Sequence, residues 1–264
     1  MNNAGAMYVA GVQLDIVWED KKANHAKVRD LVGAANLPKG ALLALPEMFA
    51  TGFSMNVAEI AQTDARETET FLAALAKQHG IFVCGGVVVR PAGAKGLNQS
   101  VTFSPDGALL ARYSKIHPFS YGGETEQYQG GSEVLTYKAG PLDVAPFVCY
   151  DLRFPEIFRV AVKKGAQLYT VIANWPEPRE AHWLALLKAR AIENQAFVVG
   201  VNRCGRDPKL AYSGRGQILD PRGNVLADGG NKEGVFGAEI DLAVLHQYRK
   251  DFPALNDARF ISGA

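Results

Sequence analysis

Three ionisable residues follow apolar runs in this sequence, and together they could carry out nucleophilic catalysis. Glu47 follows the run 41–46, Cys149 follows the run 144–148, and Lys115 follows a segment with the character of a strand. In α/β proteins the working residues sit just beyond the carboxyl ends of strands, because the loops there converge on a crevice. A thiol for attack, a carboxylate for proton transfer and an ammonium for charge stabilisation are the groups that attack on a carbonyl carbon needs.

The residues that follow Cys149 give this thiol a reason to be reactive. They lead into Pro155-Glu156, and a proline followed by an acid is typical of the first turn of a helix. A thiol near a helix N-terminus lies at the positive end of the helix dipole, so we expect a lowered thiol pKa. Backbone N–H groups of the turn can each stabilise an oxyanion by about 3 to 4 kcal/mol. The alternative is a small core residue, which is our interpretation of Cys84, while Cys204 lies in a polar loop without an evident activator.

Each of the other ionisable residues also has a plain structural alternative. Glu47 comes after apolar residues and a proline, so we expect partial desolvation and a candidate general base, but a salt-bridged loop carboxylate fits too. Lys115 is flanked by aromatic residues, although a surface lysine is the default expectation. A Cys-His hydrolase could pair Cys149 with His117 or His182, but the five histidines show no supporting spacing.

The elements that position these residues can be read from the pattern of apolar residues. Short apolar runs predict strands buried on both faces, at 8–14, 41–45, 81–89, 144–148, 168–173 and 197–201. Helical spacing predicts helices over 21–35, 68–78 and 180–195, and a helix that starts at Pro155. In the helix over 180–195, we expect Trp183 and Leu187 on the buried face, with Ile192, and Lys188 and Arg190 elsewhere.

Two segments have the residues of tight turns and indicate hairpins. Because hairpin strands are antiparallel, we expect a mixed sheet. Residues 104–107 follow the strand-like run 101–103, and residues 220–224 follow the run 217–219. The sequence contains no repeat, low-complexity tract or linker, so it predicts a single α/β domain. The tail after Asp241 is charged, dotted with aromatic residues, and without a motif of its own.

Composition and charge exclude several classes of protein. With 28 Lys and Arg against 27 Asp and Glu among 264 residues, the net charge of +1 provides no field to hold nucleic acid or an anionic membrane. The N-terminal residues lack the pattern of a secretion signal, and no apolar stretch approaches the roughly 20 residues of a membrane span. Three scattered cysteines argue against a disulfide framework and against metal-ligand spacing. We therefore expect a soluble, cytoplasmic protein.

Three segments together resemble the nitrilase superfamily of carbon-nitrogen hydrolases. They are Leu45-Pro-Glu-Met-Phe49, Tyr113-Ser-Lys-Ile-His117 and Val148-Cys-Tyr-Asp-Leu-Arg-Phe-Pro-Glu156, which carry the family's Glu, Lys and Cys in the same order and spacing. The likeness extends from about residue 8 to residue 245. The segments 46–55 and 173–176, with His182-Trp183, are most similar to the omega-amidase branch.

The resemblance implies an α/β fold, a single-domain αββα sandwich of two mixed sheets flanked by helices. The domain would span residues 1–264, with a core of about 8–245 and a C-terminal extension over 246–264. The family usually forms dimers or larger assemblies, so the resemblance implies a homo-oligomer such as a dimer or tetramer. It also implies no metal and no organic cofactor, with a small amide and water as the reacting partners.

The roles of the residues follow from the same resemblance. Glu47 would take the thiol proton and later activate water, and Cys149 would attack the amide carbon. Lys115 would stabilise the oxyanion together with the backbone N–H of Tyr150. The family has a second glutamate in the loop after the lysine, which would orient the lysine or the leaving group; Glu124 is the match, with the nearby Glu126 as competitor if the loop aligns differently.

Omega-amidases hydrolyse 2-oxoglutaramate and 2-oxosuccinamate, so their pocket must hold a carboxylate. A guanidinium suits that task because it binds carboxylates through two parallel hydrogen bonds. Arg153 is the leading candidate; it could instead pair with Asp151 or Glu156, and Arg179 and Arg203 stay open. The candidate walls of the pocket are Phe53, Met55, Tyr121 and Trp175.

Other functions remain open at this level. A nitrilase or an N-carbamoyl amide hydrolase would use the same Glu-Lys-Cys triad and differ only in its pocket. A catalytically silent ligand-binding or interaction protein could keep the fold, although the intact triad speaks against it.

Overall fold

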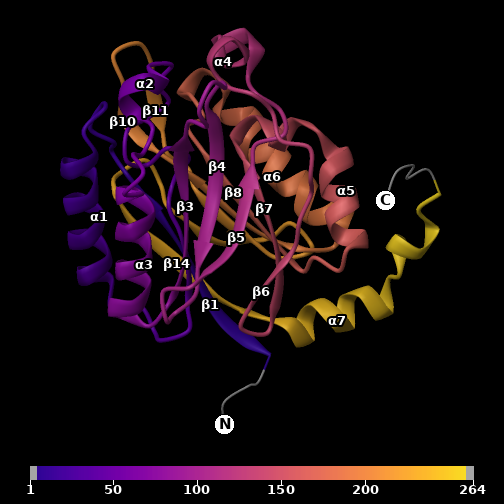
Figure 1. Cartoon of the computed structure of the whole chain (residues 1–264). Helices are drawn as coiled ribbons and strands as arrows, with labels where there is room; N and C mark the ends of the chain where they lie inside the picture. The colour runs from indigo at the N-terminus through magenta and orange to yellow at the C-terminus, as the bar shows by residue number, and fades with distance from the viewer. Residues whose placement is uncertain (1–4, 260–264) are drawn as a thin grey trace.

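Two six-stranded mixed sheets face each other in the computed structural model, with helices on their outer sides (Figure 1). The model describes residues 5–259; residues 1–4 and 260–264, the two ends of the predicted domain, lie outside the described part. The predicted αββα sandwich is therefore confirmed as the architecture of the described chain.

The first sheet brings the segments before Glu47 and Lys115 to the same edge. Strands β1, β2 and β3 are parallel, β4 is antiparallel to β3, and β5 is antiparallel to β4. Strand β5 therefore runs in the same direction as β2, so the residues that follow both strands emerge at the same edge. The strands in spatial order are β14 (Gly234–Asp241), β1 (Ala6–Gln13), β2 (Leu42–Ala44), β3 (Phe82–Val89), β4 (Leu97–Phe103) and β5 (Leu109–Ser114).

In the second sheet, the strand before Cys149 ends nearly level with its neighbour. Strands β7, β8 and β9 are parallel, and the register pairs Val148 with Ile172, so β7 and β8 end nearly level. The strands in spatial order are β13 (Val225–Asp228), β12 (Gln217–Leu219), β9 (Phe197–Asn202), β8 (Leu168–Ala173), β7 (Leu142–Val148) and β6 (Tyr137–Ala139). A separate hairpin is formed by β10 (Cys204–Arg206) and β11 (Ala211–Ser213).

The pleat of the strands divides the apolar residues between two layers. In β1, Val9 points into the core between the sheets, whereas Ala10 and Val12 point to the outer helices. Both strand faces are thus covered, which explains why the strands read as continuous apolar runs. Each fully buried Val or Leu side chain contributes about 1.5 to 3 kcal/mol to this packing.

The outer helices pack their apolar faces on the two sheets. Helices α1 (Lys21–Ala35) and α3 (Glu67–His79) cover the first sheet, and α5 (Pro155–Lys163) and α6 (Glu180–Asn194) cover the second (Figure 1). The short helices α2 (Val57–Ile60) and α4 (Glu124–Gln127) lie in the loops. The described chain also contains four 3₁₀ turns: η1 (Ser120–Gly122), η2 (Cys149–Arg153), η3 (Glu177–Arg179) and η4 (Ala254–Asp257).

The predicted helices and hairpins are present, with one error in the faces of α6. Trp183 and Leu187 are buried as predicted, but Ile192 is exposed. Arg190, which we expected to point outward, is buried, because its guanidinium donates to the carbonyl oxygen of Leu152 at 2.7 and 3.1 Å. This contact ties α6 to the turn that contains Cys149.

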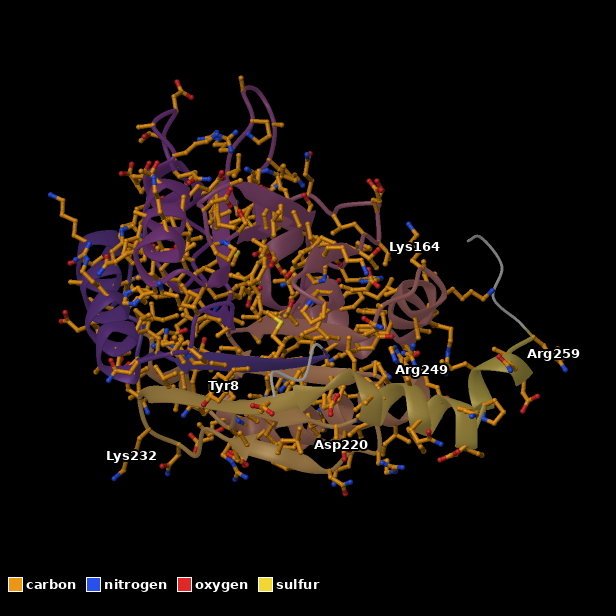
Figure 2. The ribbon with its side chains drawn as sticks, turned by 90° about the horizontal axis from the view of Figure 1, so that it is seen from below. Tyr8, Lys164, Asp220, Lys232, Arg249 and Arg259 are labelled. Carbon is orange, nitrogen blue, oxygen red and sulfur yellow. The ribbon has the colours of Figure 1, made fainter. Side chains whose placement is uncertain are left out.

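The tail after Asp241 begins with a helix, which the sequence pattern did not reveal. Helix α7 (Leu242–Asp251) starts where the Asp241 side chain accepts a hydrogen bond from the Ala243 N–H at 2.8 Å. Arg249 fastens the helix by donating to backbone carbonyl groups of Gln195 and Ala166 (Figure 2). The helix runs across residue 245, where we had drawn the boundary of the extension. Within residues 5–259, no helix combines the length and apolarity needed to cross a membrane.

Candidate active site

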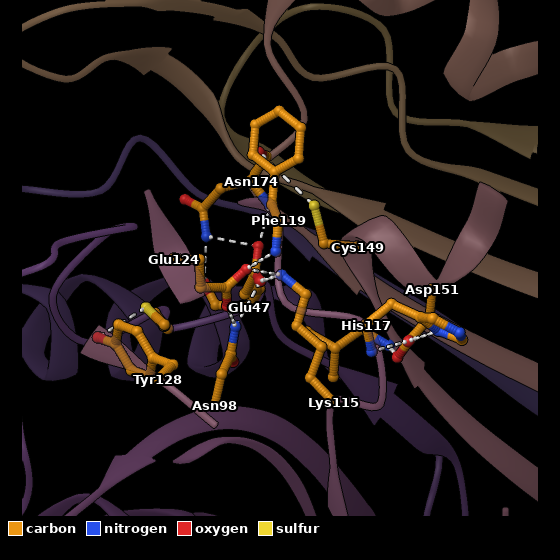
Figure 3. Close-up of polar contacts among 12 residues, drawn as sticks. Glu47, Asn98, Lys115, His117, Phe119, Glu124, Tyr128, Cys149, Asp151 and Asn174 are labelled. Carbon is orange, nitrogen blue, oxygen red and sulfur yellow. Dashed lines mark hydrogen bonds and ion pairs between the residues drawn. The ribbon is translucent and has the colours of Figure 1, made fainter. Parts of the chain in front are cut away.

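The three residues singled out from the sequence lie close together, although they follow the separate strands β2, β5 and β7 (Figure 3). Glu47 and Lys115 are fully buried, and the Lys115 Nζ lies 3.0 Å from the Glu47 Oε1. Cys149 is partly exposed, and its Sγ lies 3.9 Å from the carbonyl oxygen of Asn174. A nucleophile with access to a ligand thus lies beside a buried ion pair.

A second carboxylate joins this ion pair and answers the question of Glu124 or Glu126. The Glu124 Oε2 lies 2.8 Å from the Lys115 Nζ and also accepts a hydrogen bond from the backbone N–H of Phe119. Glu124 is fully buried, whereas Glu126 points outward from the same short helix and is exposed. Glu124 is therefore the loop glutamate that reaches Lys115.

Two asparagines, neither of which the sequence led us to consider, complete the polar network. The Asn98 Nδ2 donates to both carboxylates, at 2.7 Å to Glu47 and 2.9 Å to Glu124. Asn174, directly after β8, donates its backbone N–H to the Glu47 Oε2 at 2.8 Å and its Nδ2 to the Glu47 carbonyl oxygen at 2.6 Å. Because Asn174 also contacts Cys149, it connects the nucleophile to Glu47.

The backbone beside the site adopts conformations that ordinary residues rarely take. Met48 and Cys149 have φ values of 44° and 47°, in the left-handed region. The loop after β2 also passes very close to β3: a Cβ on Gly86 would lie 2.2 Å from the Met48 backbone nitrogen and 2.7 Å from the Glu47 Cα. Only a glycine at position 86 allows Glu47 to lie where it does.

Asp151 fixes the turn that carries Cys149. Its buried carboxylate accepts hydrogen bonds from the Tyr113 hydroxyl at 2.8 Å, from the His117 backbone N–H at 3.0 Å and from the Val148 N–H at 3.1 Å, and it lies 2.9 Å from the His117 Nδ1. The strand before Lys115 and the strand before Cys149 are thereby joined. Among the described residues, His117 contacts Asp151 and stacks on Phe154, whereas the hydrogen bond of the Cys149 thiol goes to Asn174.

The charges of the site oppose a thiolate at rest, so our expectation of a lowered Cys149 pKa is wrong. Burial and the neighbouring Glu47 carboxylate raise the pKa of this thiol well above its usual range, with Lys115 acting in the opposite direction. Burial opposes the charge of Lys115, but Glu124 and Glu47 outweigh it and raise the pKa of the ammonium. Two carboxylates against one ammonium leave a net negative charge, and a single turn of 3₁₀ helix has too small a dipole to reverse it.

A cavity of about 390 Å³ opens beside the thiol. The four residues predicted as walls, Phe53, Met55, Tyr121 and Trp175, all line it. Tyr128, which follows α4, donates its hydroxyl to the Ser54 carbonyl oxygen at 2.7 Å and so holds the loop that carries Phe53 and Met55. Additional lining residues come from several separate segments of the chain: Trp18, Phe119, Tyr150, Pro176, Pro208, Leu210 and Tyr212.

Three cationic side chains line the same cavity, namely Arg153, Arg179 and Lys209. The guanidinium of Arg153 lies 4.8 Å from the centre of the Trp175 ring, and its Nη2 lies 3.3 Å from the His182 Nδ1. This arrangement contradicts the alternative in which Arg153 pairs with Asp151 or Glu156. It also gives His182 a partner other than Cys149.

The carbon-nitrogen hydrolase family model matches residues 8–250 of the chain. The chain is a carbon-nitrogen hydrolase of the nitrilase superfamily. It is 37% identical to a 2-oxoglutaramate amidase of Bacillus subtilis, over 83% of this chain and 85% of that one. It is 38% identical to the omega-amidase YafV of Yersinia enterocolitica, over 93% of this chain and 94% of that one. Among solved structures it resembles XC1258 of Xanthomonas campestris, a CN-hydrolase superfamily protein with an arsenic adduct in its active site. The two structures superpose with a TM-score of 0.91 and 32% sequence identity, over 98% of this chain and 99% of that one.

Some residues of the hydrolase lie elsewhere than the sequence suggested. Arg203 is fully buried, donates to backbone carbonyl groups including that of Ile16, and does not line the cavity. Cys204, which we placed in a polar loop, is buried at the start of β10. Asn98 was missed because the polar residues 98–100 lack the apolar pattern of a buried strand, so the first part of β4 was not predicted. A run of amides inside a strand next to buried apolar residues is the signal that could have found it.

Proposed function

We propose that this hydrolase is an amidase of the omega-amidase type, which releases ammonia from the terminal amide of short keto acids such as 2-oxoglutaramate and 2-oxosuccinamate. The observation that carries the proposal is that the thiol of Cys149 and the guanidinium of Arg153 line one cavity of about 390 Å³. A small acid with an amide at one end and a carboxylate at the other matches such a cavity. The names of the relatives from Bacillus and Yersinia support the same substrate class.

The first half of the reaction forms a thioester. Cys149 attacks the amide carbon while Glu47 takes the thiol proton, so the charge of the thiolate never has to exist alone in this negative environment. The oxygen of the tetrahedral intermediate receives hydrogen bonds from Lys115 and from the backbone N–H of Tyr150. Each such donor lowers the barrier by about 3 to 4 kcal/mol. Glu47 then returns the proton to the amide nitrogen, the carbon-nitrogen bond breaks and ammonia leaves.

The second half releases the acid. Glu47 takes a proton from water, the oxygen attacks the thioester carbon, and the sulfur leaves as the thiol after the proton returns to it. Glu124 orients Lys115, to which it is paired at 2.8 Å. The atoms balance as one amide and one water in, one carboxylic acid and one ammonia out.

The far end of the substrate is held by charge. Arg153 lies only four residues after Cys149, and its guanidinium lies over the Trp175 ring, which restrains its position. A guanidinium can bind the substrate carboxylate through two parallel hydrogen bonds, and the cations Arg179 and Lys209 add to the attraction. One carboxylate, that of Asp207, lines the same cavity, so three cations leave a net positive charge that favours an acid amide over an uncharged nitrile.

Ammonia release from a substrate panel tests the proposal. The panel contains 2-oxoglutaramate, 2-oxosuccinamate, an aliphatic nitrile and an N-carbamoyl amino acid, and each is assayed with the wild type and with Cys149→Ala. We expect the keto-acid amides to be the best substrates and the variant to be inactive on all of them. A wild type that prefers the nitrile or the carbamoyl compound would overturn the substrate class, and a protein inactive on the whole panel would favour a silent binding protein.

A further inference from the structure

Asn98 occupies the centre of the charged network without carrying a charge. Its side chain is buried, and its single amide nitrogen donates to Glu47 at 2.7 Å and to Glu124 at 2.9 Å (Figure 3). Lys115 bridges the same two carboxylates at 3.0 and 2.8 Å. The two carboxylates are therefore joined twice, once by a cation and once by a neutral amide.

The strands bring the two bridging residues next to each other. Strands β4 and β5 pair antiparallel, with Gln99 opposite Ser114, and the backbone N–H of Lys115 donates to the Asn98 carbonyl oxygen at 2.9 Å. Asn98 is thus held by the sheet itself rather than by a loop. Its position relative to Lys115 is as rigid as the strand pairing.

A neutral donor has an advantage over a second cation in this place. It supplies hydrogen bonds to buried carboxylates, which would otherwise be costly to leave without partners. It adds no positive charge that would weaken Glu47 as a proton acceptor. An amide also cannot give up a proton, so it cannot compete with the thiol for the role of acid.

The contacts also divide the two oxygens of Glu47 between two tasks. Lys115 and Asn98 both contact Oε1, whereas Oε2 accepts from Asn174, the residue that contacts the Cys149 Sγ. We propose that Asn98 is a positioning residue of the hydrolase, which fixes Glu47 and Glu124 on Lys115 so that Oε2 of Glu47 is directed toward the thiol. Asn98 acts through Glu47 and does not touch the substrate.

A substitution at position 98 that replaces the donor nitrogen by an oxygen tests the proposal. In Asn98→Asp an oxygen replaces the nitrogen that lies between the two carboxylates. The Oδ1 of Asn98 is already buried without a hydrogen-bond partner among the described residues, so rotating the new side chain offers no alternative donor. If the third carboxyl group is ionised, it adds negative charge beside Cys149 and makes proton removal from the thiol harder. If it is protonated, its single O–H can donate to only one of the two carboxylates, so one hydrogen bond of the bridge is lost.

Alkylation of Cys149 by iodoacetamide, measured against pH with peptide mapping, tests this without depending on the substrate. We expect the midpoint of the curve to move upward by about one pH unit or more in Asn98→Asp. Gln99→Glu is the matched control, since it makes the same change one residue along the same strand, where Gln99 contacts Ser114 and Arg112 away from the cavity. The control should keep the midpoint of the wild type.

Asn98→Ser keeps the test usable if the aspartate variant does not fold. Its hydroxyl can donate to only one of the two carboxylates, so we expect slower alkylation of Cys149 at neutral pH together with a lower rate of amide hydrolysis. Thermal denaturation is measured on every variant. Wild-type alkylation curves in folded Asn98 variants would overturn the proposal, as would variants whose only change is a lower Tm. The proposed substrate can fail independently, because the alkylation curve requires none.

Discussion

The two ends of the cavity are built differently. At the reacting end, Glu47, Lys115 and Glu124 are fully buried and each is fixed by several hydrogen bonds. At the outer end, Arg153 and Arg179 are partly exposed, and Tyr121 and Lys209 are exposed. The reacting end lies where strands end, whereas most of the outer end comes from loops and 3₁₀ turns. Under the proposed function, the sheets would therefore set the chemistry and the loops, which tolerate change more easily, would set the choice of substrate.

The largest effect should follow from removing the nucleophile at the reacting end. In Cys149→Ala we expect the rate of ammonia release to fall by about 10⁴-fold or more, because no other group can form the thioester. The measurement is kcat/KM on a keto-acid amide. Cys204→Ala serves as the control, since that thiol is buried outside the cavity and should leave the activity in place. Equal losses in the two variants would mean that the effect comes from folding.

A smaller but still large effect should follow from moving Glu47 without changing it. Gly86→Ala places a methyl group 2.2 Å from the Met48 backbone nitrogen, so the loop must shift. Displacements of about 1 Å at a catalytic group can cost roughly 10²-fold, and we expect a loss of this size in kcat. Gly33→Ala in α1 is the matched control, because a Cβ there meets nothing within 4 Å and the helix should become slightly more stable. An unchanged kcat in Gly86→Ala would show that the reacting end is not rigid.

At the outer end, changes should act on binding rather than on chemistry. Arg153→Lys keeps the charge but loses the paired hydrogen bonds and the stacking on Trp175, so we expect KM for 2-oxoglutaramate to rise by about tenfold or more with a nearly constant kcat. Arg159→Lys, the same change on α5 outside the cavity, should behave as the wild type. A fall in kcat with constant KM would place Arg153 at the reacting end and contradict the division of the cavity into a reacting end and a binding end.

The smallest effect is expected at the rim of the cavity. Lys209 is an exposed residue on the loop between β10 and β11, and solvent screens its attraction for an anion. We expect Lys209→Ala to raise KM only a few-fold, and this difference should shrink in high salt. Lys188→Ala on α6, which is exposed but away from the cavity, is the comparison. A tenfold change in KM that persists in salt would mark Lys209 as a direct ligand of the carboxylate.

The same division governs what could be predicted from the sequence. The strand ends were visible because apolar runs stop abruptly at Glu47 and Cys149, and the order of the motifs supplied Lys115. Glu124 and Glu126 could not be separated, since the turn that buries one and exposes the other depends on where a short helix starts. Asn98 and Asn174 carry no charge, so neither was singled out as a site residue, although Asn174 lies in the segment 173–176 that supported the resemblance. The direction of the Cys149 pKa shift depends first on the burial of the thiol and then on the positions of both carboxylates, which only the packed sheets provide.

The central claim is that the Cys149 thiol and the buried Glu47, Lys115 and Glu124 hydrolyse the amide, while cations at the outer end of the cavity select an acid. The most direct test compares kcat/KM for 2-oxoglutaramate with that for an uncharged amide of the same length, in the wild type and in Arg153→Lys. We predict that the wild type prefers the charged substrate by about 100-fold or more, and that the preference falls about tenfold in the variant while the rate on the neutral amide stays the same. Equal kcat/KM values for the charged and the neutral amide in the wild type would contradict the account.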